Sequence, residues 1–310
     1  MIDIRKDSVT FHSVDEERIG QRIDNYLIQR LKGVPKSHIY RILRSGEVRV
    51  NKKRVDATYR LAYGDNIRLP PIRYTVPSIT PPYSTTTFSP VFEDNLMLVI
   101  DKPAGIAVHG GSGLSSGIIE QLRQSHPEYP FLELAHRLDR DTSGLLVLAK
   151  KRSALVKLHD MMRHAVLDKR YLALAIGHWP INHKHIKLPL FKFHTVDGER
   201  RVRVSDEGQA AHTIFSVKER FHDFTLVEAQ LKTGRTHQIR VHMAASACPI
   251  AGDTKYGNML LNRELTKQGL TRMFLHAWQL RFPHPVTGTP LKLEAPLPFE
   301  LSYFLKNLPR

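Results

Sequence analysis

Cysteine and long apolar runs are nearly missing from this sequence of 310 residues. Its one cysteine, Cys248, excludes an internal disulfide and a cysteine-based zinc site, which agrees with a reducing compartment. The longest run without a charged residue, 74–92, is interrupted by four prolines, so we expect no membrane-spanning segment. The first ten residues lack the apolar stretch of a secretory signal, and we therefore expect a cytoplasmic protein.

Acidic residues are also scarce. The chain has 46 Lys and Arg residues against 30 Asp and Glu residues, a formal net charge of +16 at pH 7. This balance favours a polyanionic partner, above all a nucleic acid, although the charge could also serve solubility alone. Residues 15–73 contain 14 of the basic and 7 of the acidic residues, so nearly half of the excess charge belongs to this front segment.

The front segment, 15–73, has the pattern of a small domain. Apolar residues from Ile19 to Leu31 recur at helical spacing and predict one amphipathic helix. A second helix is predicted after Pro35, and Gly46 is placed to end it. Valines around a turn at 51–53, followed by Ile67 and Leu69, predict short strands.

A linker is predicted at 74–90. The stretch 70–90 has six prolines and eight Ser or Thr residues but no acidic residue, which is typical of a linker. From 91 to 310, strand-like runs alternate irregularly with two or three helices, which predicts an α+β domain and disfavours a doubly wound nucleotide fold. The strand-like runs are 97–100, 145–148, 171–176, 224–231, 274–282 and 291–293, and the clearest helix begins at a Ser153 cap.

The densest polar cluster is HRLDRDTSG at 136–144, just before the apolar run LLVLAK. A loop with two carboxylates and two guanidinium groups can keep a carboxylate ionised and direct it into a cleft, so Asp139 or Asp141 could be a nucleophile. A salt-bridged turn is the alternative, which spacing alone leaves open. The string Asp-Thr-Ser-Gly also suggests aspartic proteases, but these need a second such loop and this chain has none.

A second cluster, TGRTHQIRVH at 233–242, lies where a strand ends and an apolar helical stretch begins. Arg235 would lie near the helix start, where an arginine opposes the helix dipole unless an anion is close. A carboxylate or phosphate partner is therefore expected there, and a plain surface arginine is the alternative. His237 and His242 are five residues apart, unlike the histidine pair of a zinc helix, and we interpret them as hydrogen-bonding residues.

The glycine-rich stretch 109–117 matches neither a P-loop nor a dinucleotide fingerprint. We interpret it as a loop that touches a nucleic-acid backbone or simply as a turn. The 17 histidines have no carboxylate or cysteine set that completes a metal site, so we predict no metal.

Three segments, in this order and spacing, resemble a known family. HRLDRDTSG at 136–144, KRYLALAIG at 169–177 and TGRTHQIRVH at 233–242 are similar to the signature segments of the RluA-type RNA pseudouridine synthases. Residues 19–69 resemble the S4-type RNA-binding domain that precedes the catalytic domain in many members. The resemblance implies an α+β chain with an S4-type domain at 15–73 and a mixed-sheet catalytic domain at 91–310.

The resemblance also implies roles for particular residues. Asp139 matches the catalytic aspartate, with Asp141 in support. Tyr171 matches the tyrosine that stacks on the target base and could act as a base, and Arg235 matches the arginine that pairs with the catalytic carboxylate. RNA contacts are expected from Arg137 at the flipped nucleotide and, in the S4-type domain, from Arg41, Arg44, Arg49, Lys52, Lys53 and Arg54.

The implied reaction is an isomerisation that needs neither a metal nor another cofactor. It breaks the bond between uracil N1 and ribose C1′, rotates the base and joins its C5 to C1′, with Asp139 as nucleophile or as base at C2′. Residues 31–54 and 107–115 most resemble members that act on large-subunit ribosomal RNA. We therefore expect that RNA or its precursor as partner, no obligate protein partner and a monomer. A tRNA-directed synthase and a non-catalytic ribosome-assembly factor are the alternatives.

Overall fold

The computed structural model describes residues 8–31, 33–72, 88–110 and 116–310. The chain divides into two units, 1–85 and 86–310, and each has its own hydrophobic core. Nearly all of the predicted linker, 74–90, lies outside the described residues, so its boundaries stay a prediction. None of the helices in the described ranges is both long and apolar enough to cross a membrane.

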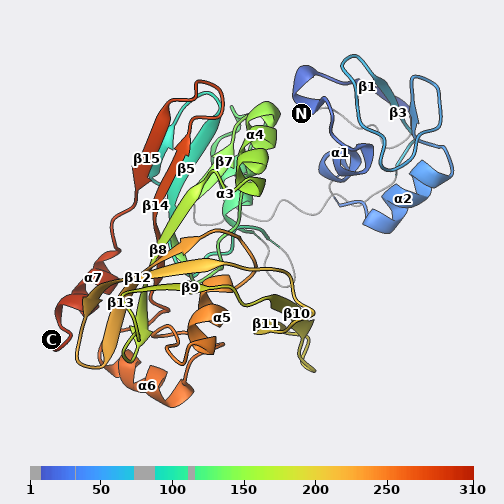
Figure 1. Cartoon of the computed structure of the whole chain (residues 1–310). Coiled ribbons are helices and arrows are strands. Elements are labelled where there is room, and N and C mark those ends of the chain that lie inside the picture. The colour runs from blue at the N-terminus through green and yellow to red at the C-terminus, as the bar shows by residue number, and fades with distance from the viewer. Residues whose placement is uncertain (1–7, 32, 73–87, 111–115) are drawn as a thin grey trace. The chain divides into compact units, whose positions relative to one another are not determined.

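The first unit combines two helices with a small antiparallel sheet (Figure 1). Its core is formed by fully buried side chains from both helices and from the sheet, among them Leu27, Ile39 and Ile67. The sheet order is β1-β3-β2. The elements are β1 (Thr10–Ser13), the 3-10 helix η1 (Glu16–Arg18), α1 (Ile23–Arg30), α2 (Lys36–Arg44), β2 (Arg49–Val50) and β3 (Asn66–Leu69).

The first predicted helix starts later than its apolar spacing suggests. The spacing places Ile19 on the core side, but its side chain is 48% exposed and α1 begins at Ile23. Gly20 has a φ of +72°, a left-handed conformation that a right-handed helix cannot contain, so the helix can form only after it. The second predicted helix is confirmed: α2 is followed by Gly46, whose φ of +75° ends the helix.

The second unit is built on a mixed sheet of ten strands among the described residues. The strand order is β4-β5-β7-β14-β8-β13-β12-β9, with β6 paired to β7 and β15 to β14. Only β7 and β14 pair parallel, and the other pairings in this sheet are antiparallel. The strands are β4 (Pro90–Glu93), β5 (Met97–Lys102), β6 (Glu133–Leu134), β7 (Ser143–Ala149), β8 (Asp168–Ile176), β9 (His183–Ile186), β12 (Thr213–Arg220), β13 (Phe224–Leu231), β14 (Leu275–Pro283) and β15 (Pro290–Glu294).

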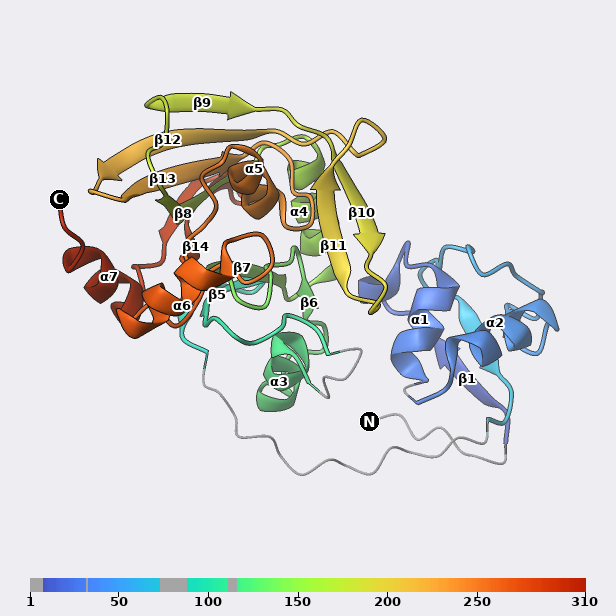
Figure 2. The same cartoon turned by 90° about the horizontal axis from the view of Figure 1, so that it is seen from below.

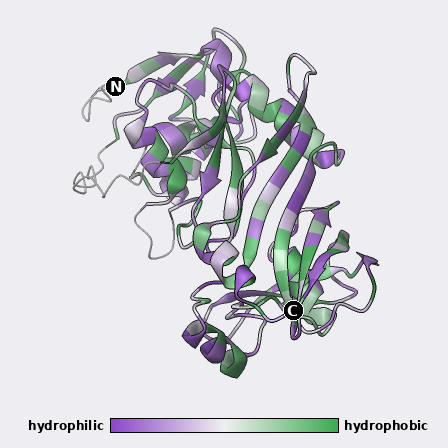
Figure 3. Ribbon diagram, turned by 90° about the vertical axis from the view of Figure 1, so that its left-hand side faces the viewer, coloured by the Kyte–Doolittle hydropathy of each residue, from purple (hydrophilic) through white to green (hydrophobic). Residues whose placement is uncertain are grey.

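Helices cover both faces of this sheet, whose strands mix hydrophobic and hydrophilic residues (Figure 3). The central strand β7 is buried along its whole length. In β7, for example, Leu146 and Leu148 belong to one core, whereas Leu145 and Val147 belong to the other. The helix on the second core is α4 (Arg152–Arg163). The helices on the first core are α3 (Ile118–Ser125), α5 (Gln238–Ala245), α6 (Met259–Lys267) and α7 (Phe299–Lys306).

A hairpin of two strands, β10 (Leu190–His194) and β11 (Arg200–Val204), forms a sheet of its own beside α5 (Figure 2). Leu190 and Val202 pack with Val241 of α5 in a small separate core. The hairpin is therefore attached to the helix that follows β13.

The strand-like runs predicted for this unit are confirmed as strands, namely β5, β7, β8, β13, β14 and β15, except that Phe274 lies just before β14. The predicted helix after β7 is confirmed as α4, but its N-cap is Lys151 and no side chain caps it. Ser153 instead lies inside the first turn, so the predicted cap is wrong.

Candidate active site

Lys102 holds the loop that carries Asp139. The side chain is fully buried, and its Nζ donates to three backbone carbonyl oxygens. These are the oxygens of Pro103, Arg140 and Thr142, at 2.8, 2.9 and 2.8 Å. An ammonium group has three N–H donors, so it can satisfy all three carbonyls at once and fix the path of the loop between β6 and β7.

The charge of Lys102 depends on pH near neutrality. Burial and the nearby Arg272 lower its pKa to about 7, while the charges of Asp141 and Asp139 oppose that shift. The three carbonyl oxygens favour the charged ammonium form of Lys102, because it has three N–H donors and a neutral amine has only two.

The strand after this loop needs a glycine. Gly144 of β7 has a φ of +107°, and a Cβ atom at this position would lie 2.2 Å from the carbonyl oxygen of Ala277. β7 and β14 pair parallel at this point, with Gly144 opposite Ala277. The Asp139 loop therefore lies where these two central strands begin.

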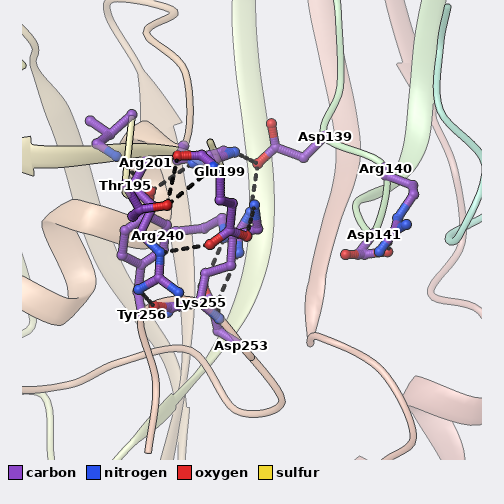
Figure 4. Close-up of polar contacts among 12 residues, drawn as sticks. Asp139, Arg140, Asp141, Thr195, Glu199, Arg201, Arg240, Asp253, Lys255 and Tyr256 are labelled. Carbon is purple, nitrogen blue, oxygen red and sulfur yellow. Dashed lines mark hydrogen bonds and ion pairs between the residues drawn. The ribbon is translucent and has the colours of Figure 1, made fainter. Parts of the chain in front are cut away.

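Asp139 forms an ion pair with a buried arginine, Arg240 of α5 (Figure 4). Nη1 of Arg240 lies 3.2 Å from Oδ2 of Asp139, and Nε2 of His237 lies 3.9 Å from the same oxygen. Within the described part of the chain, Oδ1 of Asp139 has no hydrogen-bond partner. One carboxylate oxygen is thus held by the protein and the other is open to a substrate.

Arg240 is itself fixed by a second carboxylate, Asp253. Nε and Nη2 of Arg240 each donate to one oxygen of Asp253 at 2.8 Å, a bidentate pair in which both side chains are almost completely buried. Burial opposes the charge of Arg240, but the bonds and charges of Asp253 and Asp139 outweigh it and raise the pKa of Arg240. Burial would likewise raise the pKa of Asp253, but the pairing with Arg240 lowers it below its usual range. Both groups therefore stay charged.

The predicted pair between Arg235 and Asp139 is wrong. Arg235 is exposed, and its Nε donates to the carbonyl oxygen of Ala210 at 3.1 Å. The reason lies at His237, whose left-handed φ of +53° turns the chain just before α5. Arg240 lies beyond this turn, on the buried side of the helix, and reaches the carboxylate that Arg235 was expected to reach.

Tyr171 lies on β8 and lines the same cavity as Asp139. Its side chain is only 7% exposed. Burial, and then the charge of Asp139, raise the pKa of Tyr171, so its phenol keeps its proton at physiological pH. Asp141 does not line the cavity: it pairs with Arg140 at 3.2 Å, away from Asp139 (Figure 4).

The cavity in front of Asp139 is large and cationic. Its volume is about 950 Å³, which suits a nucleotide-sized ligand. Among the described residues that line it, Asp139 is the one carboxylate, against nine cationic side chains. These are Arg137, Arg140, Arg163, Lys169, Arg200, Lys232, Arg235, Arg240 and Lys255.

The six basic residues predicted to contact RNA in the first unit are all exposed. They lie on α2 or on the segment that follows it, which turns back at Asn51 and Lys52 with positive φ angles. The six residues are Arg41, Arg44, Arg49, Lys52, Lys53 and Arg54. Their exposure leaves them accessible to a phosphate backbone.

Two further expectations have different outcomes. His237 and His242 are confirmed as hydrogen-bonding residues: Nδ1 of His237 contacts Tyr256, and both ring nitrogens of His242 have partners. Most of the glycine-rich stretch, 111–115, lies outside the described residues.

Across the described ranges, no group of three or more His, Cys, Asp or Glu side chains could hold a metal ion.

Comparisons with known proteins show the family of this chain. The model of the RNA pseudouridylate synthase family matches residues 96–245, and the S4 domain model matches residues 21–67. The ribosomal large subunit pseudouridine synthase C of Pasteurella multocida is 51% identical over 307 residues, which cover 97% of this chain and 94% of the relative. The protein of that name from Escherichia coli K12 is 50% identical over 309 residues, 97% of each chain.

Solved structures show the same similarity. The human RNA pseudouridylate synthase domain containing 4 superposes with a TM-score of 0.58 at 27% identity, covering 71% of this chain and 94% of that one. The human RNA pseudouridylate synthase domain containing 1 superposes with a TM-score of 0.58 at 26% identity, covering 73% of this chain and 90% of that one. The chain therefore belongs to the RNA pseudouridylate synthase family. It is an isomerase with an S4 domain ahead of its catalytic domain, as the three signature segments and residues 19–69 suggested.

The role of Lys102 can be tested by Lys102→Met. The variant leaves buried carbonyl oxygens without donors, and we expect it to lower the free energy of unfolding by about 3 kcal/mol. Urea titration of the full chain measures this loss. Lys267→Met, which removes only an exposed pair with Glu264, is the control and should leave the urea midpoint unchanged. Equal midpoints for the two variants would show that Lys102 does not hold the loop.

Proposed function

We propose that this enzyme converts uridines of large-subunit ribosomal RNA to pseudouridine, with Asp139 as the catalytic carboxylate. The observation that carries the proposal is the ion pair of Asp139 with the buried Arg240 at 3.2 Å. Asp139 is the one acid among the described residues that line a cationic cavity, and its Oδ1 is open. A polyanionic substrate would be drawn to this cavity and would meet a single carboxylate there.

The reaction needs an ionised carboxylate close to the ribose of a uridine. Oδ1 of Asp139 would attack C1′ or take the proton from C2′, and both routes break the bond between C1′ and uracil N1. Arg240 keeps Asp139 charged and oriented through Oδ2, and Asp253 keeps Arg240 in place. The base then rotates and its C5 bonds to C1′, which displaces Asp139 from C1′ on the first route or is followed by return of the proton to C2′ on the second. C5 loses its proton and N1 gains one, so the product is an isomer of the substrate and no other reagent is consumed.

Tyr171 fits the stacking role better than the role of a base. Its raised pKa keeps the phenol neutral, so a tyrosinate would be rare at physiological pH. Its ring lies on β8 at the wall of the cavity that holds Asp139. A flipped uracil could therefore lie against this ring while its ribose faces the carboxylate.

The cations would bind the RNA backbone. The target uridine has to leave its stack, which costs a few kcal/mol, and phosphate contacts in the cavity would offset this cost. Arg137 is exposed at the cavity wall and is placed to hold the flipped nucleotide. The six exposed basic residues of the S4 domain would supply further contacts with phosphates.

The names of the relatives support large-subunit ribosomal RNA, rather than tRNA, as the substrate. We further propose that the enzyme acts as a cytoplasmic monomer during ribosome biogenesis, without a metal, another cofactor or an obligate protein partner. Loss of the gene should then remove pseudouridines from large-subunit rRNA only. Loss of pseudouridines from tRNA instead would overturn the proposed substrate.

Asp139→Asn tests the proposed catalytic residue. The amide keeps the shape of the side chain but cannot ionise, so we expect no pseudouridine in the large-subunit rRNA of a deletion strain that expresses this variant. RNA affinity, measured by filter binding, should stay within a few fold.

Asp141→Asn is the matched control for this experiment. It makes the same chemical change in the same loop, but at a side chain outside the cavity, and should lose much less activity. If Asp141→Asn abolishes the modification and Asp139→Asn does not, the wrong carboxylate has been chosen.

Deletion of residues 1–85 tests the S4 domain. Every described residue that lines the cavity lies in 86–310, so the rate of the chemical step at saturating RNA should persist. RNA affinity should fall, and the slope of log affinity against log salt should decrease by about 0.7 to 0.9 for each phosphate that the shortened protein no longer neutralises. Binding isotherms at several salt concentrations measure both. An unchanged affinity and slope would show that the basic surface of the S4 domain does not bind RNA.

A further inference from the structure

Tyr256 connects three parts of the catalytic domain, namely α5, the β10–β11 hairpin and the turn before α6. It follows Asp253 in the turn before α6, and its hydroxyl oxygen Oη lies 2.7 Å from Nδ1 of His237. The backbone N–H of Val202, on β11, donates to the same Oη at 3.0 Å. Its ring also lies under the guanidinium group of Arg240, with the Cζ atom 5.1 Å from the ring centre.

The turn that carries Tyr256 is fixed on both sides. The backbone N–H groups of Lys255 and Tyr256 donate to Oδ1 of Asp253, at 2.9 and 3.1 Å. Glu199, at the start of the return strand of the hairpin, binds Nζ of Lys255 at 2.7 Å. Figure 4 shows this group of residues gathered around Arg240 and next to Asp139. The position of the Tyr256 side chain is therefore restricted by the turn that carries it.

The protons of these contacts can be assigned by counting donors. The N–H of Val202 can only donate, so Oη of Tyr256 accepts that bond. The phenol has one proton of its own, and the other partner of Oη in the described structure is Nδ1 of His237. Nδ1 is the acceptor that the described structure offers to that proton, and a neutral imidazole whose Nδ1 accepts carries its own proton on Nε2.

That Nε2 atom faces the catalytic carboxylate. It lies 3.9 Å from Oδ2 of Asp139, the oxygen that also accepts from Arg240 at 3.2 Å. His237 is held in this orientation by its left-handed backbone, with a φ of +53°, at the start of α5. Burial lowers the pKa of His237 and raises that of Tyr256, which supports a neutral imidazole and a protonated phenol.

We infer that Tyr256 is a positioning residue, which fixes the tautomer of His237 so that this ring presents an N–H donor, and not a lone pair, to Asp139. A lone pair at 3.9 Å from a carboxylate oxygen would repel it, whereas an N–H attracts it and favours the orientation that leaves Oδ1 open. The series of contacts runs from the N–H of Val202 through Tyr256 and His237 to Asp139. The β10–β11 hairpin, which carries Val202, therefore helps to fix the positions of these side chains. The inference rests on the proposed role of Asp139 for its effect on rate, but not for the tautomer itself.

The tautomer can be measured directly in the full chain. Proteins labelled with ¹⁵N in the histidine rings are compared by long-range ¹H–¹⁵N correlation spectra at pH 8, and the signal that disappears in His237→Gln identifies His237. We expect the proton on Nε2 in the wild type and a mixture of tautomers in Tyr256→Phe. A wild-type ring protonated on Nδ1 would overturn the inference whatever the activity.

The consequence for catalysis is a change in rate with little change in binding. Tyr256→Phe keeps the ring under Arg240 but removes the phenol proton, so the single-turnover rate should fall by about 10-fold while RNA affinity stays within a few fold. Tyr129→Phe, which removes a hydroxyl bonded to Glu93 outside the cavity, is the matched control and should keep the wild-type rate. An unchanged rate in Tyr256→Phe would overturn the positioning role.

A double-mutant cycle separates this role from a general structural one. His237→Gln places an amide N–H near the position of Nε2 without needing Tyr256, so adding Tyr256→Phe to it should cause no further loss of rate. Equal losses in both backgrounds would contradict a role through His237. Failure of the proposed function would be a different result, namely a wild-type chain that makes no pseudouridine at all.

Discussion

The bidentate pair of Arg240 with Asp253 is the interaction on which the rest of the active site depends. Both groups are buried, and burial alone would favour their neutral forms. Two bonds of 2.8 Å compensate for the lost water, and the remaining Nη1 is left to bind Asp139. Removal of one member of such a buried pair costs about 3–5 kcal/mol, because the other charge is then left without a partner. Asp139, the proposed catalytic carboxylate, is thus attached to a rigid element of the fold.

The sheet brings the parts of this site together. Asp139 precedes β7, Tyr171 lies on β8, and Arg240 lies on the helix that follows β13, so segments far apart in the sequence meet around one cavity. The parallel pairing of β7 with β14 requires Gly144, and Lys102 of the neighbouring β5 holds the loop that ends at the start of β7. Helices on both faces keep water away from the centre of the sheet, which makes these few charges effective.

Much of this architecture was predictable because its signals are local or belong to the family. The buried strands β5 and β7 contain short apolar runs, and the segments around Asp139 and Tyr171 match the family pattern. The partner of Asp139 was not predictable from spacing, because Arg235 and Arg240 lie in one signature segment. The one available signal was an arginine between Ile239 and Val241, since a charge in an apolar helix needs a buried counter-ion. Its counter-ion, Asp253, is distant in sequence.

The β10–β11 hairpin was not predicted, because its strands bury few side chains and depend for their packing on α5, which is also distant in sequence.

The most direct test compares the two arginines of that segment. Arg240→Lys retains a charge beside Asp253 but lacks the planar fork, and the single-turnover rate should fall by about 100-fold in a folded protein, with RNA affinity nearly unchanged. Arg235→Ala should instead weaken RNA binding and leave the rate at saturating RNA close to that of the wild type. A full rate in Arg240→Lys together with a large loss of rate in Arg235→Ala would contradict the assignment of Arg240 as the residue that holds the catalytic carboxylate.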